Sequence, residues 1–267
     1  MKKFGLIGDP IAHSLSPALF RAGYGGKYPY ELIEGSSFES SWRRFEEEFD
    51  GINVTAPFKE LAFDRADILS EECKMILATN LMVKTIEGVK AYNSDFLGVR
   101  KWLEEEFALL GGPCKVLVAG CGGAGKAVAA AAHSLSADVL LMNRDASRAD
   151  RVAQHLASFP TGGNLQVRPL GEFCSGVREC GIVIYNIPAP IAALEELSAD
   201  DFEGGKVILE ANYRCPSFRV LPDGTIASSQ GLGRYVDGRK WLLYQALTGY
   251  EIFTGEMPDL SSMEACL

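Results

Sequence analysis

Residues 115–125 read KVLVAGCGGAG, an apolar run followed by the glycine pattern Gly120, Gly122 and Gly125. The run has the composition of a buried strand, and residues 124–135 have the composition of a helix. A glycine-rich turn between a strand and a helix is the opening element of a parallel α/β unit that binds dinucleotides. The stretch therefore predicts a Rossmann-like half of the chain with a dinucleotide site at this turn.

Each glycine of the turn has an expected task. Gly120 permits the tight bend, Gly122 lets the backbone approach a pyrophosphate, and Gly125 lets the helix pack closely on the strand. The backbone amides of Gly122, Gly123, Ala124 and Gly125 would face the bound anion at the helix N-terminus. A structural turn without a ligand is the alternative.

The end of the next expected strand bears on which dinucleotide is bound. It reads Met142-Asn143-Arg144-Asp145, where an NAD site usually places an acidic residue for the ribose hydroxyls. The Arg144 guanidinium instead suits the 2′-phosphate of NADP, and Arg148 adds positive charge. Asp145 is expected to cap the following helix, whereas a carboxylate turned to the ribose would favour NAD. We expect NADP, with NAD as the alternative.

Strand-like and helix-like segments alternate along most of the chain, an order typical of α/β proteins with mostly parallel sheets. The first half predicts strands at 3–7, 30–33 and 51–54, a hairpin of 81–85 with 89–92 through Glu87-Gly88, and helices from 17 and at 39–49, 59–66, 70–78 and 96–107. The second half predicts strands at 115–119, 138–142, 166–169, 181–186 and 206–211, helices at 124–135, 146–158 and 239–253, and a loop at 231–238.

Two sheets fit this pattern better than one. The turn Gly111-Gly112-Pro113 marks a boundary between an N-terminal α/β domain of residues 1–110 and a doubly wound, parallel-sheet dinucleotide domain of residues 111–237. The C-terminal segment 238–267 is expected to pack back on the first domain.

Composition and charge exclude several classes of protein. The chain has 267 residues, 47% of them apolar, which excludes intrinsic disorder. Its formal net charge of -9 argues against nucleic-acid binding. No apolar run approaches the ~20 residues that span a bilayer, and residues 1–4 are expected to lead into a strand and not into a signal sequence. We expect a cytoplasmic location without membrane contact; the partner is a small molecule, and the chain is a monomer or a homodimer.

Cysteine and histidine usage gives no metal or disulfide pattern. The seven cysteines include no CxxC pair, so reduced thiols are expected. The chain has three histidines, His13, His133 and His155, and none is spaced as a ligand pair. We predict no metal site.

Polar segments interrupt the first half where strands should end or helices begin, positions at which polar groups are costly without a partner. They are residues 14–17 (SLSP), 53–59 (NVTAPFK), 78–80 (ATN) and 93–95 (NSD). Lys59 lies near a helix N-terminus, where a cation is disfavoured and proton transfer is eased. A solvated surface lysine is the alternative.

Asp95 begins the helix that leads to the second domain. Its alternative role is that of an N-cap. A carboxylate beside Lys59 would orient the amine toward a substrate hydroxyl, so the two residues are candidates for an acid–base pair.

The polar segments together resemble the shikimate dehydrogenase family over nearly the whole chain. Residues 14–17 are similar to its SxSP loop, 53–59 to NVTxPxK, 93–98 to NTDxxG, 120–125 with 143–144 to GxGGAxxA and NRT, and 238–245 to GxxMLxxQ. The resemblance implies reversible reduction of 3-dehydroshikimate to shikimate with NADPH, on a substrate domain and a dinucleotide domain.

The resemblance also implies residue roles. Lys59 and Asp95 would be the acid–base pair. Ser14 and Ser16 would bind the substrate carboxylate, and the ring hydroxyls would be bound by Thr55, Asn80, Asp95 and Gln245. Tyr213 would also contact the substrate, and Asn143 would join Arg144 at the cofactor.

Four departures from the family pattern leave alternatives open. Residues 78–81 (ATNL) replace AVNT, residues 186–190 (NIPAP) replace NATSxGM, Trp241 replaces a methionine, and Asp145 replaces the threonine of NRT. These changes keep two other functions in view: a dehydrogenase for quinate or another cyclic hydroxy acid using NAD or NADP, and a protein that senses a dinucleotide or shikimate without turnover.

Overall fold

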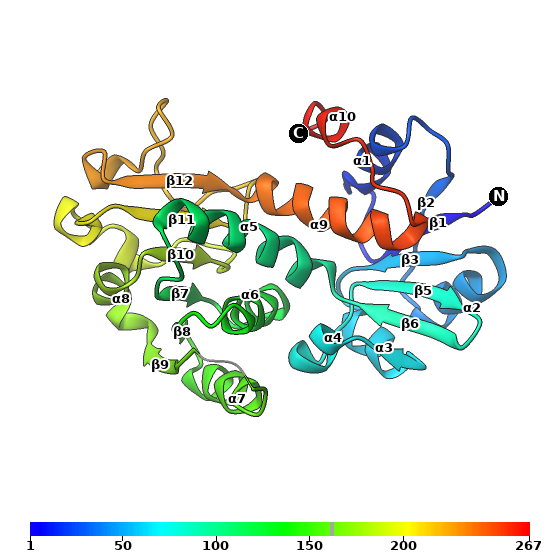
Figure 1. The fold of residues 1–267 in the computed structure, drawn as a ribbon, viewed down its shortest axis with the longest axis horizontal. Helices are drawn as coiled ribbons and strands as arrows, with labels where there is room; N and C mark the ends of the chain where they lie inside the picture. The colour runs from blue at the N-terminus through cyan, green and yellow to red at the C-terminus, as the bar shows by residue number, and fades with distance from the viewer. Residues whose placement is uncertain (161–162) are drawn as a thin grey trace. The chain divides into compact units, whose positions relative to one another are not determined.

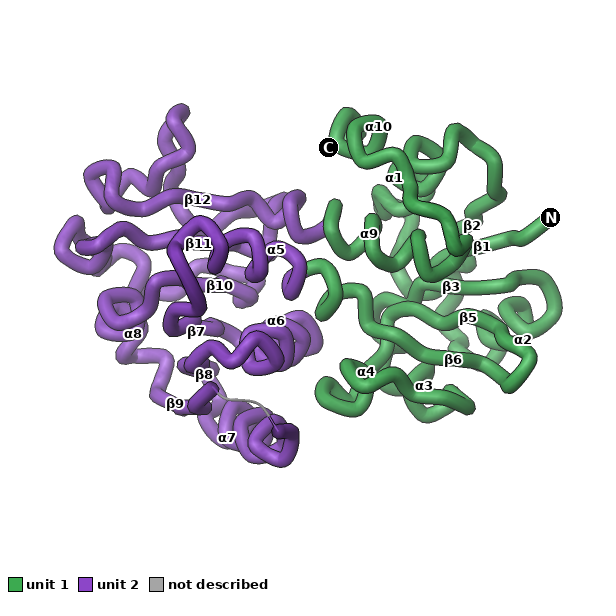
Figure 2. The backbone as a smooth tube through the Cα atoms, in the orientation of Figure 1, with its two compact units in different colours: residues 1–98, 243–267 green, residues 99–242 purple. Residues whose placement is uncertain are grey.

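The chain divides into two compact units in the computed structural model, which describes residues 1–160 and 163–267 (Figures 1 and 2). Unit 1 comprises residues 1–98 and 243–267, and unit 2 comprises residues 99–242. The helices α5 (Ser94–Leu110) and α9 (Gly238–Thr254) contribute residues to both units.

Unit 1 contains a six-stranded mixed sheet with the order β2-β1-β3-β5-β6-β4. β1 pairs in parallel with β2 and β3, whereas β5 is antiparallel to β3 and β6. The strands are β1 (Phe4–Gly8), β2 (Tyr30–Glu34), β3 (Gly51–Val54), β4 (Ile68–Leu69), β5 (Leu81–Thr85) and β6 (Gly88–Tyr92). The helices are α1 (Ser16–Gly23), α2 (Phe38–Glu48), α3 (Lys59–Asp64), α4 (Glu71–Ile76) and α10 (Leu260–Glu264).

Aromatic side chains bury both faces of this sheet. On α2, Phe38, Trp42 and Phe45 follow a helical spacing and pack with Ile7 of β1 on one face. Phe4 lies three residues before Ile7 and therefore points to the opposite face. There its ring stacks on Phe253 of α9 with centroids 4.8 Å apart and lies 5.5 Å from Phe20 of α1.

Unit 2 contains a six-stranded sheet with the order β12-β11-β10-β7-β8-β9, parallel at every pairing. The strands are β7 (Val116–Ala119), β8 (Val139–Asn143), β9 (Leu165–Pro169), β10 (Ile182–Tyr185), β11 (Lys206–Glu210) and β12 (Gly233–Asp237). The helices are α6 (Gly123–Ser134), α7 (Ala146–Leu156) and α8 (Phe173–Glu179), with short 3-10 turns η1 (Leu170–Glu172), η2 (Ala192–Leu194), η3 (Ala199–Phe202) and η4 (Ala227–Ser229).

This strand order is that of the doubly wound dinucleotide-binding fold, so the predicted fold class is confirmed. All four residues of β7 are buried, as expected for a strand covered on both faces. Leu117 and Ala119 share a core cluster with Phe173 and Val177 of α8. Val116 and Val118 point to the other face and are also buried.

Two local expectations were wrong. Residues 231–238 were expected to be a loop, but β12 pairs with β11, with Gly233 beside Lys206. As an edge strand with Arg234 and Asp237 in it, β12 lacks the apolar run that identifies a buried strand. The expected hairpin is present, but Thr85 pairs with Gly88, which places Ile86 and Glu87 in the turn. No helix in the described ranges combines the length and apolar character of a membrane span.

Buried phenols make stability sensitive to alkaline pH, and Tyr24 and Tyr185 are two of them. Burial raises the pKa of Tyr24 and of Tyr185 to about 12. An unfolded tyrosine titrates near pH ~10. Below that pH both states are protonated and the stabilisation is fully present. As the pH rises through the window up to about 12, the unfolded chain releases protons that the fold retains.

We therefore predict that the free energy of unfolding, measured by urea denaturation, falls as the pH increases above ~10. Tyr24→Phe and Tyr185→Phe should each make that decline shallower. A decline of unchanged slope in both variants would contradict the assignment.

Candidate active site

The carboxyl ends of β1 and β3 lie at the same edge of the unit 1 sheet. Ile7 pairs with Val54, and beyond the strands the Asp9 amide donates to the carbonyl of Ala56 at 3.2 Å. The loops that follow these two strands therefore lie side by side. They lead to Ser14 and Ser16 on one side and to Thr55 and Lys59 on the other.

Lys59 and Asp95 form an ion pair at this edge. The Lys59 Nζ lies 2.5 Å from Asp95 Oδ2, and the side chains are 26% and 12% exposed. Lys59 is the first residue of α3, and Asp95 is the second residue of α5. The Asn93 side chain caps α5, because its Oδ1 accepts from the Phe96 amide at 3.1 Å. Asp95 is thereby left to bind Lys59 with a charge-assisted bond.

Asn80 is held in one orientation beside the ion pair. Its Oδ1 accepts hydrogen bonds from the Ser94 amide at 2.6 Å and from the Ser94 hydroxyl at 3.2 Å. Because both bonds use the carbonyl oxygen, the Asn80 amide nitrogen points away from Ser94 and can donate to a ligand. The Asn80 backbone carbonyl accepts from the Val54 amide at 2.8 Å, which joins it to the end of β3.

Ser14 and Ser16 stand at the start of α1. Their hydroxyl oxygens are 3.2 Å apart, and the Ser16 amide donates to the Ser14 hydroxyl at 3.2 Å. No side chain caps α1 at Leu15. The helix therefore presents its positive end together with two hydroxyls, a combination suited to a carboxylate.

The backbone of Gln245 lies against α5 at a close approach of two helices. A Cβ added to Gly98 of α5 would lie 2.4 Å from the backbone nitrogen of Gln245. A Cβ added to Gly249 would lie 3.1 Å from the Cβ of Ser94. The absence of side chains at these glycines lets α9 approach α5, with Gly98 one helical turn beyond Asp95.

The glycine-rich turn of unit 2 has the geometry expected for an anion site. Gly120 has φ +95°, and a Cβ at Gly125 would lie 1.8 Å from the Gly120 carbonyl oxygen. A Cβ at Gly122 or Gly123 would meet nothing within 4 Å. Gly122 is the N-cap of α6, and no side chain caps this helix. The space before the first turn is therefore open to a phosphate.

Residues at the end of β8 and directly after it lie beside this turn. The Asn143 Oδ1 accepts from the Cys121 amide at 3.1 Å, which fixes the turn against β8. Asp145 caps α7, accepting from the Ser147 amide at 3.0 Å and the Ser147 hydroxyl at 2.7 Å. The hydroxyl bond is the main cause of the lowered pKa of Asp145. Arg144 and Arg148 are exposed beside this cap.

Residues 186–190 also lie against the turn. The Asn186 amide donates to the Ala119 carbonyl at 2.8 Å, and a Cβ at Gly120 would lie 3.2 Å from Ile187 Cγ1. Tyr213 follows β11 in unit 2, where Arg239 lies over its ring at 5.9 Å. Ser14, Ser16, Thr55, Lys59, Asn80, Asp95 and Gln245 lie in unit 1, whereas Tyr213 and the expected cofactor residues lie in unit 2.

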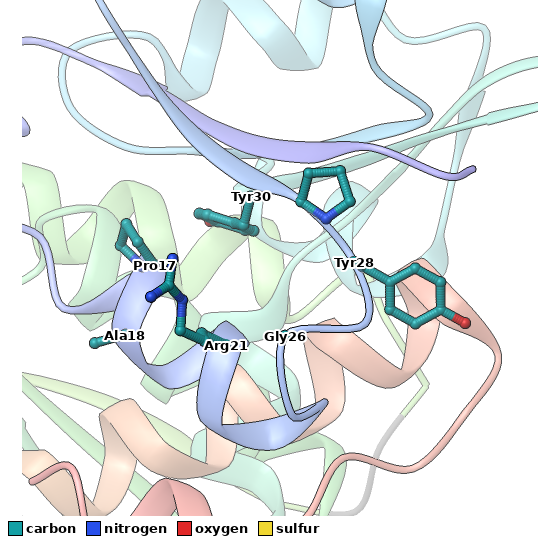
Figure 3. A pocket seen from close by; sticks show the side chains of 7 residues that line it. Pro17, Ala18, Arg21, Gly26, Tyr28 and Tyr30 are labelled. Atoms are coloured by element: carbon teal, nitrogen blue, oxygen red, sulfur yellow. The ribbon is translucent and has the colours of Figure 1, made fainter.

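A separate hollow of about 340 Å³ lies between α1 and β2 (Figure 3). Its lining residues are Pro17, Ala18, Arg21, Gly26, Tyr28, Pro29 and Tyr30. None of the expected site residues lines it.

Comparison with known proteins identifies the family. A family model described as the shikimate dehydrogenase substrate binding domain matches residues 6–82. The chain is 31% identical over 271 residues to the shikimate dehydrogenase (NADP(+)) of Pyrococcus abyssi, covering 98% of this chain and 96% of that protein. This chain belongs to the shikimate dehydrogenase family.

Solved structures resemble the chain over its full length. A shikimate 5-dehydrogenase from Thermus thermophilus, in complex with NADP(H) and shikimate, is 28% identical with a TM-score of 0.79, covering 100% of this chain and 98% of that one. A quinate dehydrogenase from Corynebacterium glutamicum, in complex with NAD, is 23% identical with a TM-score of 0.81, covering 99% and 98%. At that identity the second likeness concerns the fold alone.

Three residues that shape the candidate site were not among the expected site residues. Asn93, not Asp95, caps α5. The close approach of α9 to α5 at Gly98 was not expected. A glycine inside a helix lowers helix stability, so its presence there can indicate that a neighbouring element packs closely against it. Gly249 acts in the same way on the opposing helix.

We predict that Gly125→Ala lowers the free energy of unfolding by ~1–3 kcal/mol or more, because its Cβ collides with the Gly120 carbonyl oxygen. Gly123→Ala is the matched control, since its Cβ meets open space and should change stability by less than ~0.5 kcal/mol. Urea denaturation of both variants measures the difference. Equal stability of the two variants would show that the turn does not need this close contact.

Proposed function

We propose that the chain is an NADP-dependent shikimate dehydrogenase, which interconverts 3-dehydroshikimate and shikimate. The observation that carries the proposal is the 2.5 Å ion pair of Lys59 and Asp95 at the sheet edge where Ser14, Ser16 and Thr55 follow their strands. Relatives named shikimate dehydrogenase (NADP(+)), aligned over nearly the whole chain, support the same substrate.

The substrate would be held by groups of unit 1 on both its acidic and its hydroxylated sides. The Ser14 and Ser16 hydroxyls, together with the start of α1, suit the carboxylate. The oriented amide of Asn80, with Thr55 and Gln245, suits the ring hydroxyls. Tyr213 of unit 2 is proposed as a further substrate contact.

Lys59 is proposed as the proton donor and acceptor. During reduction its ammonium gives a proton to the carbonyl oxygen, and during oxidation the amine takes the proton from the hydroxyl. Asp95 accepts a hydrogen bond from Lys59 and so holds the ammonium in one orientation. The Lys59 side chain is 26% exposed, which lets the proton exchange with water between turnovers.

The dinucleotide would be held by unit 2. Gly120, Gly122, Gly123, Ala124 and Gly125 would receive the pyrophosphate, and Arg144 and Arg148, beside Asn143, would receive the 2′-phosphate. When bound, the nicotinamide would supply or accept the hydride at the carbon whose attached oxygen exchanges a proton with Lys59. Asp145 is engaged with Ser147 as a helix cap, and this supports NADP over NAD.

The function is tested by an assay that crosses shikimate and quinate with NADP and NAD. The highest kcat/KM is expected for shikimate with NADP. A preference for quinate would support the related cyclic hydroxy-acid dehydrogenase instead. Binding of shikimate with no turnover under any pairing would favour a sensing protein and contradict the proposal.

We predict that Lys59→Ala lowers kcat by ~10²–10⁴-fold, because the variant lacks the proton-transferring group. The KM for shikimate should change far less, since the lost interaction acts mainly in the transition state. Lys74→Ala is the control: its exposed ion pair with Glu71 lies on α4, and activity should be unchanged. Full turnover by Lys59→Ala would remove this residue from the mechanism.

A further inference from the structure

Two tyrosines lie behind the substrate side of unit 1. Tyr250 of α9 is 2% exposed, and its hydroxyl donates to the backbone carbonyl of Ser16 at 3.0 Å. The half-buried Tyr30 of β2 donates from its hydroxyl to Asn53 Oδ1 at 2.8 Å. The ring centroids are 6.1 Å apart, and Phe20 lies 4.8 Å from each. Each phenol therefore donates a hydrogen bond to a residue of a segment expected to bind substrate, residues 14–17 or residues 53–59.

The Tyr250 contact fixes the first turn of α1. Ser16 begins that helix, and the loop before it is held locally by the Ser14 amide, which donates to the Ile11 carbonyl at 2.9 Å. The hydrogen bond from α9 anchors Ser16 to the packed body of unit 1. Phenylalanine would fill the same space beside Phe20 and Phe253, so the hydroxyl adds this bond rather than volume.

The Tyr30 contact extends toward the ion pair. Asn53, which accepts from Tyr30, donates through Nδ2 to the Asn80 carbonyl at 3.3 Å. Asn80 in turn accepts from Ser94, the residue before Asp95. A continuous set of hydrogen bonds therefore runs from Tyr30 to the start of α5. The ring of Tyr30 also lines the hollow at α1 and β2 (Figure 3).

Both phenols stay protonated across ordinary pH. Burial raises the pKa of Tyr30 and of Tyr250 well above the usual value, and a hydrogen bond with the Ser16 side chain partly offsets this effect for each. A neutral phenol remains a hydrogen-bond donor. Tyr30 and Tyr250 can therefore hold their partners under all conditions in which the enzyme would be assayed.

We infer that Tyr250 and Tyr30 are positioning residues for substrate binding: Tyr250 sets the place of Ser16, and Tyr30 sets the place of Asn53 and Asn80. The inference rests on the proposed function, because it takes Ser16 and Asn80 as substrate ligands. Neither phenol takes part in proton or hydride transfer. Loss of either hydroxyl should weaken substrate binding and leave the chemical step intact.

The test compares three tyrosine-to-phenylalanine variants by steady-state kinetics. Tyr250→Phe and Tyr30→Phe should each raise the KM for shikimate by about 3- to 10-fold, with kcat within about twofold and the KM for NADP unchanged. Tyr24→Phe is the matched control, because its hydroxyl contacts the Tyr250 carbonyl, Thr254 and Glu256, which are not proposed ligands. It should leave the KM for shikimate unchanged.

A second measurement separates positioning from general stabilisation. If Tyr250 acts through Ser16, Tyr250→Phe should add little to the KM of a Ser16→Ala variant. Thermal unfolding of every variant shows whether a lost hydroxyl lowers stability equally at positions 24, 30 and 250.

Three outcomes decide the matter. Absence of shikimate turnover by the unaltered protein overturns the proposed function, and the inference with it. Turnover with equal KM values in Tyr250→Phe, Tyr30→Phe and Tyr24→Phe overturns the inference alone. A Tyr250→Phe effect that persists undiminished in the Ser16→Ala background also overturns it.

Discussion

The chemistry proposed for unit 1 depends on the contact between the Lys59 ammonium and the Asp95 carboxylate. Lys59 stands at the start of α3, where the helix dipole disfavours a cation, whereas Asp95 stands at the start of α5, where it favours an anion. Placing the carboxylate 2.5 Å from the ammonium offsets the first effect. Because Asn93 caps α5, Asp95 is available for this pairing.

Backbone proximity is the second constraint, and it operates in both units. At Gly125 a side chain would collide with the Gly120 carbonyl, so the strand–turn–helix contact of unit 2 requires glycine. At Gly98 and Gly249 the same requirement lets α9 approach α5 and brings the Gln245 backbone against Gly98. Behind them, the aromatic cluster of Phe4, Phe20 and Phe253 fixes α1 and α9 on one face of the sheet.

The fold class could be predicted from the sequence, because apolar runs and glycine-rich turns are local patterns that identify buried strands and the turns between strands and helices. The edge strand β12 could not be predicted, because its composition is not that of a strand. It is a strand because it pairs with β11. The approach of Lys59 to Asp95 could be expected from the family resemblance, but its distance depends on tertiary packing. The partners of Tyr250 and Tyr30 could not be predicted, since aromatic residues at helical or strand spacing ordinarily indicate core packing.

The proposal for the active site is that Lys59, held by its bond to Asp95, exchanges a proton with one substrate oxygen, to which the Asp95 carboxylate also bonds. A crystal structure of the protein with shikimate and NADP bound tests it most directly. The account predicts one ring hydroxyl about 3 Å from both the Lys59 Nζ and an Asp95 carboxylate oxygen. Shikimate bound away from this pair, or a ring hydroxyl held by neither side chain, would contradict it.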